Sequence, residues 1–222
     1  MTRLAIIHTT PATIDPLKAL AQELMPGVDV INFVDDSILP QLAENGGDVS
    51  AVEERLVAYA RFAEEVGADI ILEACSSVGE VVDRMRAAVD IPVVRIDTAM
   101  AREAVRRGEL IGVAATLSTT LRPTTRLIRE TAELMGKDVE VQPLLVEGAF
   151  ERLVEGDRDA HDRLVADALR SLARSTDIVV LAQASMAGVV SRLPAELQKR
   201  FLTSPRSGME LVRDISETTD GE

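Results

Sequence analysis

The sequence predicts an α/β protein built from two related halves, and three observations support this fold class. Short runs rich in Val, Ile and Leu alternate with stretches of helical periodicity, apolar residues make up 46% of the chain, and one half matches the other at an offset of 108 residues. Buried strands that alternate with amphipathic helices are typical of parallel sheets covered by helices. We therefore expect two pseudo-symmetric, doubly wound subdomains.

Seven short apolar runs predict strands that are buried on both faces. They are Leu4–Ile7, Val28–Phe33, Ile70–Leu72, Val93–Ile96, Ile111–Ala115, Val139–Val141 and Ile178–Leu181. Apolar positions at three- and four-residue spacing predict helices between these strands. The helical stretches are residues 15–25, 50–66, 78–88, 98–107, 121–135, 150–155, 160–174 and 186–199. Pro16 at a helix start, and Gly67, Gly108 and Gly136 at helix ends, support these boundaries.

The internal repeat fixes the domain organisation. Ala68–Met85 aligns with Thr176–Leu193 at seven identical positions of 18, where unrelated segments of average composition give about one. The same offset places Leu4–His8 over Gly112–Thr116. We expect one subdomain at 1–97 with 206–222 and a second at 98–205. Arg206–Thr218 returns to the first as a helix, because Ser207–Ile215 has helical spacing.

The composition excludes several classes of function. The chain carries 24 basic and 37 acidic residues, a net charge of −13, which argues against binding to nucleic acid or to an anionic membrane surface. Its apolar runs are shorter than a signal peptide core or the ~20 residues of a membrane span. The single cysteine, Cys75, forms neither an internal disulfide nor a cysteine-based zinc site. We expect a cytoplasmic protein.

Polar loops follow the predicted strands and are the candidate binding site, because open parallel sheets bind ligands at the carboxyl ends of their strands. In the first half the loop residues are His8, Thr9 and Thr10, and then Cys75, Ser76 and Ser77. In the second half they are Thr116, Ser118 and Thr119, and then Gln183 and Ser185. Helix capping is the alternative explanation for so many hydroxyl groups.

Cys75 is the candidate acid/base. It follows an apolar strand and precedes a predicted helix that begins near Val78, and the dipole of that helix would stabilise a thiolate. Backbone N–H groups at the same helix start, together with the hydroxyl groups of Ser76 and Ser77, would bind a carboxylate. The alternative is an inert buried thiol. The pattern predicts a thiolate base beside a carboxylate site.

Other polar residues allow two interpretations. His8 transfers a proton or orients a substrate, or it is simply hydrogen-bonded at a strand end. Arg122 and Arg126 hold a second acidic group of a substrate, or they are plain surface charges. We expect His161 at the surface among charged neighbours, and Asp35–Ser37 as a helix start rather than a metal site. We therefore expect no metal. Because glycine-rich phosphate loops are absent from the sequence, we also expect no cofactor.

Four segments in this order and spacing resemble the aspartate/glutamate/hydantoin racemase superfamily along nearly the whole chain. They are Ile6–Thr10, Ala74–Ser77, Ile111–Thr119 and Leu181–Met186. The resemblance implies an active site between two pseudo-symmetric subdomains, cofactor-independent proton transfer at a carbon next to a carboxylate or carbonyl of a small acid, and a homodimer.

The resemblance also assigns roles to two loop residues. Two-base members of the superfamily place a cysteine on each side of the reacting carbon, and Cys75 matches the first of these positions. Gln183 stands at the second, where it can only form hydrogen bonds. Other members that keep a single cysteine, at the second position, are decarboxylases.

We therefore expect a cofactor-independent isomerase with Cys75 as its acid/base and proton transfer mainly on one face of the substrate carbon. One variant of this hypothesis passes a proton between adjacent carbons through Cys75 and His8. The alternatives are a decarboxylase of the same superfamily and a non-catalytic protein that binds small anions.

Overall fold

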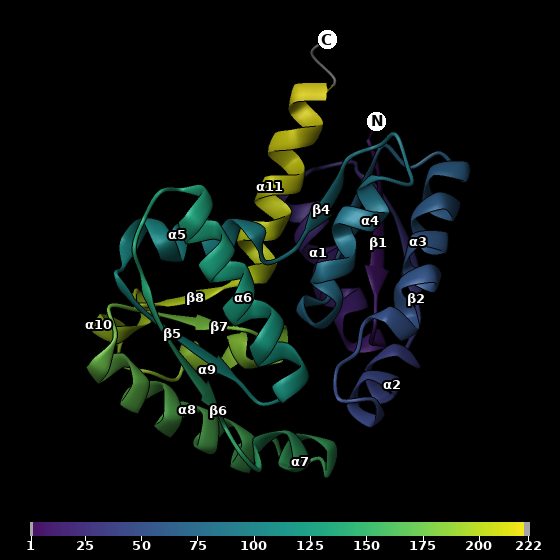
Figure 1. Cartoon of the computed structure of the whole chain (residues 1–222). Helices are drawn as coiled ribbons and strands as arrows, with labels where there is room; N and C mark the ends of the chain where they lie inside the picture. Colours follow the sequence, from purple (N-terminus) through teal and green to yellow (C-terminus); the bar gives the residue numbers. More distant parts are fainter. Residues whose placement is uncertain (1, 220–222) are drawn as a thin grey trace. The chain divides into compact units, whose positions relative to one another are not determined.

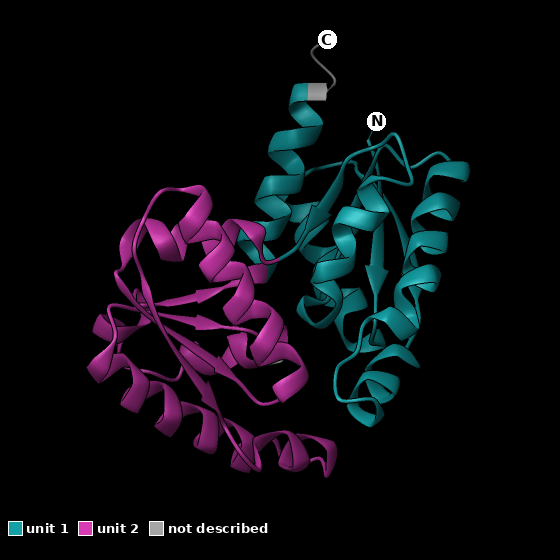
Figure 2. Cartoon of the chain, viewed as in Figure 1, with its two compact units in different colours: residues 1–96, 205–222 teal, residues 97–204 magenta. Residues whose placement is uncertain are grey.

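The computed structural model describes residues 2–219, apart from the side chains of residues 185 and 219. The chain forms two compact units, residues 1–96 with 205–222 and residues 97–204 (Figure 2). Each unit contains a four-stranded parallel sheet flanked by helices (Figure 1). The predicted α/β class with two subdomains is therefore confirmed, and the predicted limits at 97 and 205 lie one residue from the limits of the units.

The first unit has the strand order β2-β1-β3-β4. Its strands are β1 (Arg3–His8), β2 (Asp29–Val34), β3 (Ile70–Glu73) and β4 (Val93–Arg95). Its helices are α1 (Ile14–Leu24), α2 (Ile38–Glu44), α3 (Ser50–Glu65), α4 (Val82–Arg86) and α11 (Ser204–Thr219), with short 3₁₀ segments η1 (Pro11–Thr13) and η2 (Ser76–Val81).

Both faces of this sheet are buried, because alternate strand residues point to opposite faces. Leu4 and Ile6 of β1 pack in one cluster with residues of α1 and α11. Ala5 and Ile7 pack in the other cluster with residues of α2, α3 and α4. Helix α11 lies close to the end of β4, since a Cβ atom at Gly208 would collide with the carbonyl oxygen of Ile96. The closing segment thus completes the first unit.

The second unit repeats this plan with the strand order β6-β5-β7-β8. Its strands are β5 (Leu110–Ala115), β6 (Glu140–Leu145), β7 (Ile178–Leu181) and β8 (Phe201–Thr203). Residues of α5 (Thr98–Arg107) and α6 (Ser118–Leu134) pack in the cluster of one face. The cluster of the other face contains residues of α7 (Ala149–Val154), α8 (Arg158–Ser175) and α9 (Ala187–Val190), and η3 (Ala184–Met186) and α10 (Ala195–Gln198) follow β7.

The sheet registers correct the repeat at its first strand. Leu4 pairs with Ile70 in the first unit, and Ile111 pairs with Ile178 in the second. The offset is therefore 108 residues between β3 and β7 but 107 between β1 and β5. As a result Thr9 corresponds to Thr116, and the predicted match of His8 with Thr116 was wrong by one residue.

Three further predictions differ from the structure. Strand β8 was not predicted, because three residues at a sheet edge carry too little periodicity to be recognised. The single helix predicted over 186–199 is instead the pair α9 and α10, which Pro194 separates because proline does not fit a helix interior. Helix α2 was predicted only through its start near Ser37.

Among the described residues, no helix has the length and apolar character to cross a membrane.

Candidate active site

Two neighbouring strands of the first unit bring Thr9 and Cys75 together. β1 pairs with β3 up to Ile7 and Glu73, so the loops that follow the two strands begin side by side. Cys75 has extended backbone angles and is the N-cap residue of η2. Three groups donate hydrogen bonds to the Cys75 sulfur. They are the Thr9 hydroxyl, the Ser77 N–H and the Ser77 hydroxyl. The predicted Thr/Ser loops of this half therefore surround the only thiol of the chain.

The Cys75 thiol has a raised pKa, contrary to the sequence-based expectation of a stabilised thiolate. Burial raises the pKa of Cys75 to about 11, and the negative charge of Glu73 is the second cause, while the hydrogen bonds from Thr9 and Ser77 oppose the shift. The expected helix dipole is weak, because η2 is a six-residue 3₁₀ segment and α4 has five residues. At neutral pH the thiol is therefore protonated and suited to donate a proton.

His8 ends β1 and is fully buried. Its Nδ1 lies 2.7 Å from the Thr13 hydroxyl and its Nε2 lies 2.9 Å from Asn32 Oδ1. The Thr13 hydroxyl also donates to the Thr10 carbonyl. Burial lowers the pKa of His8, and the hydrogen bond with Asn32 opposes the shift. These contacts favour the hydrogen-bonded alternative, in which His8 holds the loop that carries Thr9 and Thr10.

In the second unit, Gln183 takes the place of Cys75. Its Oε1 accepts hydrogen bonds from the Thr116 N–H at 2.6 Å and from the Thr116 hydroxyl at 3.0 Å. Gln183 is the N-cap residue of η3, as Cys75 is of η2. The pairs Thr9–Cys75 and Thr116–Gln183 are thus equivalent in topology, with a thiol in one unit and a carboxamide in the other.

The other predicted loop residues have varied surroundings. Thr10 caps η1 by accepting the Ala12 N–H, and Ser76 is buried at the start of η2. Ser118 and Thr119 form the first turn of α6, where Ser118 is exposed and Thr119 half-buried. Ser185 lies in η3, and its side chain is outside the described part of the structure.

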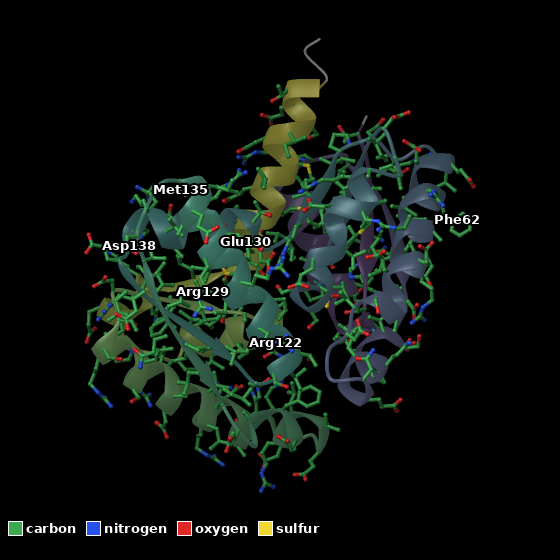
Figure 3. The ribbon with its side chains drawn as sticks, viewed as in Figure 1. Phe62, Arg122, Arg129, Glu130, Met135 and Asp138 are labelled. Atoms are coloured by element: carbon green, nitrogen blue, oxygen red, sulfur yellow. The ribbon has the colours of Figure 1, made fainter. Side chains whose placement is uncertain are left out.

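The surroundings of Arg122, Arg126 and Asp35 favour surface or structural roles over the binding of a substrate or a metal. Arg126 pairs with Glu130 one helical turn away, and Arg122 is an exposed side chain of the same helix, α6 (Figure 3). Asp35 accepts hydrogen bonds from Arg55 and from the Tyr59 hydroxyl, both at 2.9 Å. Burial raises the pKa of Asp35, but the hydrogen bonds from Ser37 and Tyr59 and the positive charge of Arg55 hold this pKa below its usual value. Asp35 is thus part of an ion-paired turn.

His161 is a correction to the sequence analysis. It was expected at the surface, but its side chain is fully buried. Its Nδ1 lies 2.7 Å from Asp162 Oδ1, and the other oxygen of Asp162 pairs with Arg192 at 3.0 Å. The charged neighbours of His161 in the sequence include its own buried partner, Asp162, which periodicity alone did not reveal.

A hollow of about 730 Å³ lies at the amino ends of the strands in the second unit, on the edge opposite to Gln183. Two of its charged side chains form hydrogen bonds with the backbone around it. Lys137 Nζ donates to the carbonyl groups of Val105 and Arg106, and Asp177 accepts the N–H groups of Glu109 and Leu110. This hollow is therefore not a candidate for catalysis.

Sequence reasoning missed two buried charged residues beside Cys75. Glu73 has no exposed surface, and its Oε1 accepts the Cys75 N–H at 2.6 Å. Arg95 is 7% exposed and is the partner of Glu73 in the β3–β4 register. The sequence signal that could have revealed Glu73 is a carboxylate at the end of an apolar strand.

Within the described residues, no cluster of three or more His, Cys, Asp or Glu side chains has the arrangement of a metal site.

The fold and the paired strand-end loops define a two-unit α/β protein with one thiol site. The family model of Asp/Glu/Hydantoin racemase matches residues 5–212. The chain belongs to this family, as the sequence resemblance predicted. A search of curated proteins gave no match.

Solved structures of several enzymes have the same fold. Glutamate racemase from Bacillus anthracis is 13% identical with a TM-score of 0.77, over 98% of this chain and 82% of that one. Allantoin racemase from Klebsiella pneumoniae is 16% identical with a TM-score of 0.73, over 99% and 89% of the two chains. A mutant of arylmalonate decarboxylase is 18% identical with a TM-score of 0.64, over 95% and 92%. At these identities the likeness describes the fold alone.

Proposed function

We propose that this protein is a cofactor-independent enzyme that transfers a proton at a carbon next to a carboxylate or carbonyl of a small acid, with Cys75 as its acid/base. The observation that carries the proposal is the thiol at the end of β3, which receives hydrogen bonds from Thr9 and Ser77. Donors placed around a sulfur stabilise the thiolate that remains after the proton has been given away.

Proton transfer is confined to one face of the substrate carbon. Gln183 stands at the position equivalent to Cys75, and a carboxamide has no proton to exchange near neutral pH. Its role is to donate and accept hydrogen bonds. A two-base racemisation through this pair of residues is therefore not part of the proposal.

Hydroxyl and backbone donors at the strand ends bind the acid group of the substrate, because such donors at a helix start suit an anion. In the first unit we assign this role to Thr9, Thr10, Ser76 and Ser77, and in the second to Thr116, Ser118, Thr119 and Ser185. His8 is a positioning residue for the loop that carries Thr9 and Thr10, since both its ring nitrogens already have partners.

Two reaction types fit one protonated thiol. In an isomerase, the Cys75 thiol first gives its own proton to water, the thiolate removes a proton from the α-carbon, and the thiol so formed returns a proton to that carbon. In a decarboxylase, the bond between the α-carbon and the carboxylate breaks, carbon dioxide leaves, and the electron pair on the α-carbon takes the proton of the thiol. Water then restores that proton to the thiolate. The raised pKa of Cys75 favours the second reaction, because the thiol enters it in its protonated form.

Replacement of Cys75 by Ala tests the proposal. Aspartate, glutamate and an arylmalonate serve as probes in heavy water, and NMR measures α-proton exchange and loss of carbon dioxide. We expect the wild-type protein to act on at least one probe, and Cys75→Ala to slow that reaction by at least ~10²-fold, the contribution of a general acid or base.

Cys75→Ser is the matched control, because it keeps a small hydroxyl donor but has no group that ionises near neutral pH. We expect it to be as slow as Cys75→Ala, with an unchanged melting temperature. Undiminished turnover in Cys75→Ala would contradict the catalytic role of the thiol. Acids that raise the melting temperature without any turnover would instead identify a non-catalytic anion-binding protein.

A further inference from the structure

Glu73 is the last residue of β3, and Cys75 follows two positions later with extended backbone angles. Residues two positions apart along an extended chain point to one side, and Cys75 packs against the same cluster as Ile71 of β3. The rest of that face is apolar, since Ile71 packs there with Val78, Met85 and Val93. Glu73 has no exposed surface. Burial of a carboxylate is costly without compensation, so its presence here requires an explanation.

Two groups lie next to Glu73. One is the Cys75 N–H, which donates to Glu73 Oε1 at 2.6 Å. The other is Arg95, the register partner of Glu73 on β4. The Arg95 guanidinium lies over Gly79 of η2, where any Cβ atom would collide with it. Gly79 thus leaves the room that the buried arginine occupies.

The second unit shows that the fold does not need this arrangement. Leu181 stands at the position of Glu73 and pairs in register with Thr203, which stands at the position of Arg95. Ala187 takes the position of Gly79 at the repeat offset. The combination of carboxylate, guanidinium and glycine at these positions therefore occurs in the unit that carries the thiol. The second unit has Leu, Thr and Ala at the equivalent positions.

We propose that Glu73 is a positioning residue for Cys75, whose buried carboxylate holds the Cys75 backbone at the end of β3 and keeps the thiol in its protonated, proton-donating form. A fixed negative charge in a poorly solvated place opposes a second negative charge on the neighbouring sulfur. The raised pKa of Cys75 agrees with this role, although burial is its larger cause. This inference rests on the proposed function of Cys75 as the group that transfers the proton.

Other charged groups on the elements around Cys75 are paired or at the surface. His8 of β1 contacts Thr13 and Asn32. Asp35, after β2, pairs with Arg55 of α3. Glu53 of α3 pairs with Arg84 of α4, and Glu80 of η2 is exposed. Glu73 and Arg95 are thus the buried charges next to Cys75 among these groups.

The test measures the ionisation of Cys75 directly, which is straightforward because the chain has one cysteine. Alkylation by iodoacetamide is followed by mass spectrometry between pH 6 and 10.5, and the rise of the rate with pH reports the thiolate fraction. We expect Glu73→Gln to increase the rate at pH 8 about 3- to 10-fold and to shift the profile to lower pH. Looser packing alone would scale the whole profile without this shift.

Glu64→Gln is the matched control, because Glu64 also accepts a backbone N–H, that of Asp90, which lies before the amino end of β4 and not at the carboxyl ends of the strands. Its profile should equal that of the wild type. A second variant keeps the test valid if Glu73→Gln fails to fold. It combines Glu73→Leu, Arg95→Thr and Gly79→Ala, so that the three positions carry the residues of the second unit. It should fold and show the same shift as Glu73→Gln.

A Cys75 profile that stays at the wild-type pH in both the Glu73 variants would overturn the inference and leave Glu73 a structural residue. The alkylation measurement needs no substrate, so its result does not depend on whether the proposed function is correct. Where turnover of a probe acid is found, the direction of its change in Glu73→Gln separates the two reactions. A thiol that acts as an acid loses rate at alkaline pH, and one that acts as a base gains rate at neutral pH.

Discussion

At the scale of single residues, His8 shows how burial makes stability depend on pH. Its side chain is fully buried, and burial lowers its pKa from 6.5. The unfolded chain therefore takes up a proton near pH 6.5 that the folded protein does not accept. The contribution of neutral His8 to stability is complete above that pH and is lost as the pH falls toward the lower pKa of the folded state.

We therefore predict that the free energy of unfolding of the wild-type protein falls between pH 7.5 and 5.5, and that it falls less in His8→Gln. Urea unfolding followed by circular dichroism measures both slopes. Parallel slopes for the two proteins would show that His8 titrates alike in the folded and unfolded chains.

At the scale of secondary-structure elements, one glycine sets the distance between β5 and α8. A Cβ atom at Gly112 would lie 2.7 Å from Cγ of Leu172, and Leu172 is nearly fully buried in the core of the second unit. In the first unit the equivalent position on β1 is Ala5, which is also buried. The two units thus carry glycine and alanine at equivalent buried positions.

Gly112→Ala should therefore destabilise the protein by ~1–3 kcal/mol, the usual cost of adding a methyl group to a full core. Gly188→Ala is the matched control, because Gly188 lies in α9 with open space where its Cβ would stand. We expect the control to be neutral or slightly stabilising, since alanine favours a helix over glycine. Equal melting temperatures for Gly112→Ala and the wild type would contradict the tight packing.

The elements also show what the sequence can and cannot predict. Strands such as β1 and β5 were found because apolar runs identify strands that are buried on both faces. The three-residue strand β8 was missed because its pairing with β7 depends on tertiary contacts. The 107-residue offset at the first strand was missed for the same reason, since the register between strands is a property of the folded sheet.

At the scale of the whole molecule, the duplication predicted both the architecture and the position of the thiol. It placed Cys75 and Gln183 at equivalent strand ends, and the structure gives each a threonine partner, Thr9 and Thr116. The protonation state of Cys75 was not predictable, because it depends on Glu73 and on burial in the folded unit. A helix dipole inferred from the sequence was not enough to decide it.

The most direct test of the central claim is the ratio of proton exchange to inversion at the α-carbon in heavy water. The probe is an enantiomerically pure acid on which the wild-type protein acts, followed by NMR and chiral chromatography. One thiol on one face predicts exchange with retained configuration that is much faster than inversion, and Gln183→Cys should raise inversion relative to exchange. Inversion as fast as exchange in the wild-type protein would contradict the account, because it requires a second acid/base on the opposite face.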